Sequence, residues 1–104
     1  MRVIGTVVEK ESGRPIAGLQ VRAFDRDLLI DDKLGVAVTD SAGAFRIDYG
    51  NVNFSHGLET TPELYVKVFD ATGKKLLFTS KKSIRKEPQV EERYDIAIPK
   101  TTLA

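Results

Sequence analysis

Residues 19–25, Leu19-Gln20-Val21-Arg22-Ala23-Phe24-Asp25, alternate apolar and polar side chains with a period of two. Successive side chains of a β-strand point to opposite faces, so this alternation predicts a strand with one buried face. Leu19, Val21 and Ala23 would face the core, while Gln20 and Arg22 would face the other way. The stretch therefore predicts a half-buried strand of a layered β protein.

The same pattern extends along the chain in both directions, and no stretch keeps a helical period for three turns. Turn sequences such as Asp40-Ser41-Ala42-Gly43 and Asp70-Ala71-Thr72-Gly73 separate the alternating segments. Parallel strands would need helical crossovers, which no gap offers. The sequence thus predicts an all-β, seven-stranded antiparallel sandwich spanning residues 1–99 as one domain, followed by a frayed tail at 100–104. The six further strands are expected at 2–8, 35–39, 44–49, 64–70, 75–80 and 94–98.

Composition narrows the range of functions. The formal net charge is +1, which argues against a nucleic-acid partner held by a broad positive field. The chain has no cysteine, which excludes disulfides, thiolate metal sites and cysteine nucleophiles. No apolar run approaches the ~18 residues of a membrane span. The compartment stays open between secretion and a cytoplasmic stage before export as part of a larger system.

Antiparallel consecutive strands would place their connections alternately at the two ends of the sandwich. The longest connections then share one end, which is where binding surfaces of such sandwiches usually form. We expect this end to bind a protein partner. Its connections are 26–34, 50–63 and 81–92, whereas 10–18, 40–43 and 70–74 lie at the opposite end. The candidate binding residues are Asp27, Leu29, Asn51, Phe54, His56, Lys82 and Arg85.

One connection is rich in aspartate, and two interpretations of it remain open. Asp25, Asp27, Asp31 and Asp32 resemble in their spacing the loops of calcium-dependent lipid-binding sandwich domains, so they are candidate calcium ligands. Basic residues inside the cluster and the absence of a central glycine weigh against a metal. Alternatively, the aspartates cap turns and form salt bridges, while Leu28, Leu29 or Ile30 tucks under the loop.

Two other features of the sequence are candidate sites. The segment 74–86 holds six basic residues and no acid, and it would contact either an anionic partner or the aspartate-rich loop. His56 is the only histidine, too few for a catalytic zinc or iron site, and nothing around it suggests a nucleophile. We therefore expect no catalytic residues and no cofactor. Most of the aromatic side chains are expected to pack in the core.

The chain resembles the transthyretin-like, or prealbumin-like, group that includes the carboxypeptidase regulatory-like domains. The stretches that carry the resemblance are Val7-Val8-Glu9, Ser12-Gly13-Arg14-Pro15-Ile16-Ala17-Gly18-Leu19-Gln20-Val21-Arg22-Ala23-Phe24-Asp25, Asp31-Asp32-Lys33-Leu34-Gly35, Thr39-Asp40-Ser41-Ala42-Gly43-Ala44-Phe45-Arg46-Ile47 and Pro62-Glu63-Leu64-Tyr65-Val66-Lys67-Val68. The resemblance implies a Greek-key sandwich, often an accessory domain beside an enzyme, a bacterial surface protein or a secretion-system component. It also implies self-association through an edge strand, for which 74–79 is the candidate.

Enzymes of this group would need residues that the chain lacks. The hydroxyisourate hydrolases use several histidines and a Tyr-Arg-Gly-Ser ending, whereas this chain has one histidine and ends Ile98-Pro99-Lys100-Thr101-Thr102-Leu103-Ala104. Intradiol dioxygenases bind iron through two tyrosines and two histidines, a set that a chain with one histidine cannot supply. The resemblance therefore implies an interaction module, with a calcium-binding domain as the alternative and a hydrolase as the less favoured one.

Overall fold

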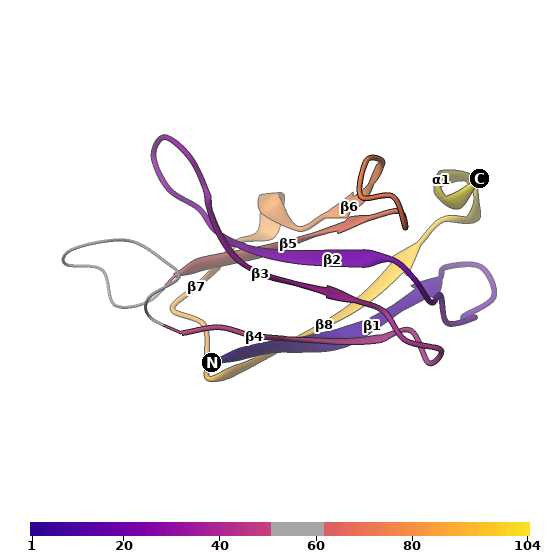
Figure 1. Cartoon of the computed structure of the whole chain (residues 1–104), viewed down its shortest axis with the longest axis horizontal. Helices are drawn as coiled ribbons and strands as arrows, with labels where there is room; N and C mark the ends of the chain where they lie inside the picture. Colours follow the sequence, from indigo (N-terminus) through magenta and orange to yellow (C-terminus); the bar gives the residue numbers. More distant parts are fainter. Residues whose placement is uncertain (51–61) are drawn as a thin grey trace.

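The computed structural model describes residues 1–50 and 62–104, which form two packed β-sheets (Figure 1). One sheet has the order β4-β1-β8, and the other has the order β3-β2-β5-β6, with β7 also paired to β5. The fold is an all-β sandwich. The strands are β1 (Arg2–Glu9), β2 (Gln20–Asp25), β3 (Asp32–Val38), β4 (Ala44–Asp48), β5 (Glu63–Phe69), β6 (Leu76–Thr79), β7 (Arg85–Lys86) and β8 (Glu91–Ile98).

The core lies between the sheets and follows from the alternation in the sequence. Every second residue of β1 and β2 is buried, and β8 alternates in the same way from Arg93 onward. Tyr49 and Tyr94 pack in this core, as expected, whereas Tyr65 is buried on the outer face of its sheet, stacked on Phe24. The fully enclosed aliphatic side chains include Val3, Val7, Val21, Leu64, Val66, Val68 and Ile98.

One strand pair contradicts the expected antiparallel arrangement. β1 and β8 are parallel, with a continuous register from Arg2 opposite Glu91 to Glu9 opposite Ile98. The expectation assumed that a parallel pair needs a helical crossover. Here the crossover is the rest of the chain, which passes through the other sheet between β1 and β8. The described residues contain eight strands rather than seven, because β7 adds a short pairing with β5.

Two strands start three residues earlier than the alternation indicates. β3 begins at Asp32 instead of residue 35, and the register with β2 shifts between Ala23 and Phe24. β8 begins at Glu91 instead of residue 94, because its charged first residues pair with the start of β1. Residues Lys100–Leu103, expected to be frayed, form one helical turn, α1, and Leu103 packs against the core. No helix in the described part of the chain is long and apolar enough to cross a membrane.

The connections divide between the two ends of the sandwich (Figure 1). Segments 10–19, 39–43 and 70–75 lie at the end where β8 finishes. Segments 26–31 and 80–90 lie at the opposite end, which we call the loop end. β6 is at the edge of its sheet, which is the position that the sequence predicts for a self-association strand.

Candidate binding site at the loop end

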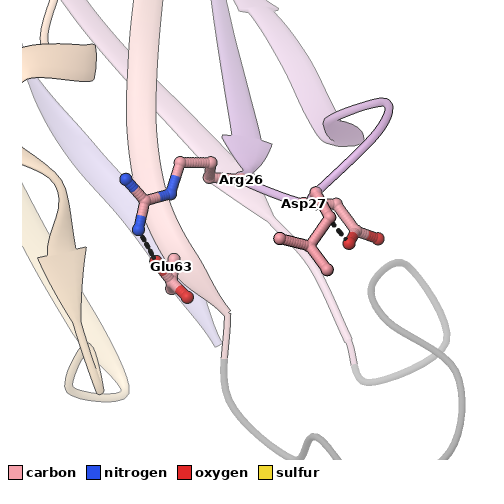
Figure 2. Close-up of a pocket in the computed structure, with 4 residues that line it drawn as sticks. Arg26, Asp27 and Glu63 are labelled. Atoms are coloured by element: carbon pink, nitrogen blue, oxygen red, sulfur yellow. Dashed lines mark hydrogen bonds and ion pairs between the residues drawn. The ribbon is translucent and has the colours of Figure 1, made fainter.

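The loop of residues 26–31 is held at its base by the start of β5. Asp25 is 1% exposed, and its Oδ1 accepts a hydrogen bond of 2.8 Å from the Glu63 amide. The Arg26 amide donates to the Glu63 carbonyl at 3.0 Å, and the Arg26 guanidinium pairs with the Glu63 carboxylate. Figure 2 shows Arg26 turned toward Glu63 and away from Asp27. These contacts fix the direction in which the loop leaves the sheet.

The loop is closed by Asp31, which three groups hold. Its Oδ1 accepts from the Asp27 amide at 3.0 Å, and its Oδ2 pairs with Lys81 Nζ at 2.9 Å and accepts from the Tyr65 hydroxyl. Burial alone would raise the pKa of Asp31, but these hydrogen bonds and the Lys81 charge outweigh burial and lower the pKa to about 2. Asp31 is therefore charged at neutral pH and joins the loop to the 80–90 segment.

The tip of the loop carries three consecutive apolar side chains that contact almost nothing. Leu28 is 98% exposed, Leu29 is 95% exposed and Ile30 is 80% exposed. The Leu28 amide donates to Asp27 Oδ1 at 2.6 Å, which turns the chain at this point. The expectation that one of these side chains tucks under the loop is wrong. All three side chains of the tip are instead largely exposed.

A pocket of about 530 Å³ lies beside the tip, and Arg26, Asp27, Leu28 and Glu63 line it (Figure 2). Its cationic group is already neutralised by Glu63. The pocket presents an apolar side chain, Leu28, next to one exposed carboxylate, Asp27. The described part of this lining therefore combines an apolar surface with one negative charge.

Of the remaining candidate binding residues, Lys82 is free to reach a partner, whereas Arg85 is held within the molecule. Lys82 is exposed in the 3₁₀ turn Lys81–Ser83. Arg85 is engaged within the molecule, because its guanidinium donates to Glu92 and to the Arg93 carbonyl, both at 2.8 Å, and lies 3.7 Å from the centre of the Tyr94 ring. Asn51, Phe54 and His56 lie outside the described residues.

The four candidate calcium ligands do not share one site. Asp25 faces the buried start of β5, Asp31 is bound to Lys81 and Tyr65, and Asp27 is exposed at the surface. Asp32 is half-buried in β3. Among residues 1–50 and 62–104, no group of three or more histidine or carboxylate side chains is placed to hold a metal ion. The Lys81–Asp31 pair is the contact expected between the basic segment and the aspartate-rich loop.

Comparisons with known proteins bear on the fold. No family model matches the sequence, and no curated protein matches it. Among solved structures, the chain is similar to part of a 9R-lipoxygenase from Cyanothece PCC8801, with a TM-score of 0.61 and 21% identity. The match covers 92% of this chain and 15% of the lipoxygenase chain. At this level of identity the likeness shows the fold alone, that of an all-β sandwich.

Proposed function

We propose that this protein is a non-catalytic binding module of the transthyretin-like group that contacts its partner through the loop end. The observation that carries the proposal is the tip Leu28-Leu29-Ile30, whose three side chains are 80–98% exposed. Contiguous exposed apolar groups of this kind usually mark an interaction surface. Burial of each side chain would contribute about 2 kcal/mol, so a partner that covers all three gains a substantial part of its affinity there.

The rigid base of the loop supports this role. The Arg26–Glu63 and Lys81–Asp31 pairs hold both ends of the loop, so the tip is presented without a large ordering cost on binding. The sequence predicts a protein partner, and any partner of the loop end, whether a protein or another apolar surface, would cover the tip. The accessory role and the Greek-key arrangement implied by the family resemblance belong to the same proposal.

The proposal is tested by photo-crosslinking from the tip. A photoreactive phenylalanine derivative replaces Leu29, and the protein is irradiated in the cells that produce it. A discrete adduct, a protein or a lipid, is expected from this position. A protein carrying the same derivative at Ala97, an exposed position of β8 on the other sheet, serves as the matched control.

The adduct must also depend on the tip itself. Changing the two neighbours, Leu28→Ser and Ile30→Ser, should reduce the adduct at position 29 without unfolding the protein, because neither side chain is buried. Equal adducts at positions 29 and 97, or none at either, would overturn the proposal.

A further inference from the structure

The two outer faces of the sandwich differ in charge. On the outer face of the β4-β1-β8 sheet, arginines and carboxylates pair with one another: Arg2 with Glu91 at 3.2 Å, Arg46 with Asp48 at 3.0 Å and Arg93 with Asp95 at 3.0 Å. These pairs leave that face close to neutral. It is the charged, solvated surface expected of a free sheet face.

The outer face of the β3-β2-β5-β6 sheet is basic. Residues opposite each other in neighbouring antiparallel strands share a face, which places Arg22 beside Lys67 and Phe24 beside Lys33 and Tyr65. Among the described strand residues that point this way, the charged ones are Arg22, Lys33, Lys67, Lys86 and Glu63. Glu63 is neutralised by Arg26. The face therefore carries a net positive charge.

The basic face also carries exposed apolar side chains between its charged residues. Val36 is 48% exposed, Val38 is 60% exposed and Leu76 is 45% exposed, all on this side of the sheet. Phe24 stacks on Tyr65 with ring centres 5.2 Å apart, and Arg22 lies 4.0 Å from the centre of the Phe69 ring. Basic groups and exposed apolar groups thus occur together on one face.

The apolar tip projects on this same side. Asp31, at the base of the loop, is bound to Tyr65 and Lys81, and Lys81 lies 5.5 Å from the centre of the Tyr65 ring on the outer face. Figure 1 shows the 26–31 loop rising from this sheet, away from β4, β1 and β8. Lys82 is exposed beside Lys81, and Asp27 is the exposed carboxylate at the tip. One side of the molecule therefore combines an apolar projection with a basic surface.

We infer that this side docks on an anionic lipid surface, with Leu28, Leu29 and Ile30 entering the boundary between headgroups and acyl chains. The inference rests on the proposed function and names its partner. Apolar insertion and attraction of lysines to acidic headgroups are the two terms that hold peripheral proteins on membranes. A second copy of the chain suits the face less well, because two-fold pairing would bring Arg22, Lys33 and Lys67 against their own equivalents.

The test is flotation of the whole protein with lipid vesicles in excess EDTA. One set of vesicles is phosphatidylcholine alone, and the other contains phosphatidylglycerol as well. Binding to the phosphatidylglycerol vesicles is expected, and it should weaken as salt is added. EDTA is included because Asp31 is already held by Lys81 and Tyr65, so no calcium is expected to be needed.

Two variants separate the apolar and the charged contributions. Leu28→Ser/Leu29→Ser/Ile30→Ser should abolish flotation, whereas Val90→Ser, at another exposed apolar residue of the loop end, should not. Lys33→Gln/Lys82→Gln should lower the affinity about fivefold for each lysine. Lys10→Gln/Lys100→Gln removes the same charge from exposed positions at the opposite end and should have little effect.

Four other results would overturn the inference, and each points to a different explanation. Flotation that survives the triple serine change would reflect charge alone, and flotation that appears only with calcium would point to the aspartates. An absence of flotation combined with a protein adduct at position 29 would reject the lipid surface while leaving the binding module in place. An absence of both would reject the binding module as well.

Discussion

Asp31 links the acid stability of the protein to the geometry of the candidate site. Its pKa is about 2 in the folded protein and 3.8 without its partners. A carboxylate whose folded pKa is depressed stabilises the fold above its unfolded pKa, and this contribution is lost as the pH falls through the folded value. The stabilisation from Asp31 should therefore be complete above about pH 4 and disappear toward about pH 2.

We predict that Asp31→Asn lowers the free energy of unfolding by about 1–2 kcal/mol at neutral pH and flattens its dependence on pH between about 2 and 4. Denaturant titrations at a series of pH values measure both effects. Asp27→Asn, an exposed carboxylate in the same loop, is the control and should change neither. An unchanged pH profile in Asp31→Asn would show that the Tyr65 and Lys81 contacts do not form in solution.

Gly5 is the residue that the parallel strand pair depends on most directly. A Cβ atom at this position would lie 1.8 Å from the Tyr94 carbonyl oxygen and 2.9 Å from Cζ of Phe45. Gly5→Ala should destabilise the protein by about 2 kcal/mol or more, since the backbone of β1 or β8 must move. Gly50→Ala, where nothing lies within 4 Å, should be close to neutral. Thermal unfolding of both variants measures the difference.

At the scale of elements, Thr39 joins the start of β2 to the end of β3. It is 4% exposed; its hydroxyl accepts from the Leu19 amide at 3.0 Å and donates to the Ile16 carbonyl at 2.7 Å. Thr39→Val keeps the shape but removes the partner of the buried Leu19 amide and of the partly buried Ile16 carbonyl, which should cost about 1–3 kcal/mol. Thr6→Val removes an exposed hydrogen bond to Asp95 and should cost under about 0.5 kcal/mol. Denaturant unfolding compares the two.

The strands themselves could largely be predicted from the sequence. β2 and β5 alternate apolar and polar residues in sequence, and β1 is rich in β-branched residues, so local patterns are sufficient to predict these three strands. The start of β8 was missed because Glu91 and Glu92 are both charged, and only pairing with β1 makes them part of a strand. The direction of β8 was missed for a related reason: alternation is identical in parallel and antiparallel strands. Pairing between residues about 90 positions apart leaves no local pattern.

The candidate site could be predicted only in part. The 26–31 loop was found from its aspartates, and the Lys81–Asp31 pair was anticipated from the charges. The sequence predicts Leu29 as a contact residue but not the exposure of all three tip side chains, because apolar residues in a loop usually cover a core. The basic sheet face was missed as well, since Arg22, Lys33 and Lys67 lie far apart in the sequence. Only the register of β3, β2 and β5 brings them together.

At the scale of the whole molecule, the central strands of each sheet should exchange their amide hydrogens more slowly than the edge strands. β1, β2 and β5 are hydrogen-bonded to strands on both sides, while β3, β4, β6 and β8 each have one neighbouring strand among the described residues. Amide hydrogen exchange followed by NMR should therefore be slowest in the three central strands. Equal protection in β3 and β2 would contradict this order.

The parallel pair of β1 and β8 also determines how the molecule responds to tension. β1 starts at the loop end and β8 finishes at the far end, so residues 1 and 104 lie toward opposite ends of a body 44 Å long (Figure 1). A pulling force applied through these two residues acts along both strands. It shears their hydrogen bonds together, whereas strands pulled apart from one end would unzip one bond at a time. Stretching between residues 1 and 104 is therefore expected to load the β1–β8 hydrogen bonds in shear, all at once rather than one after another.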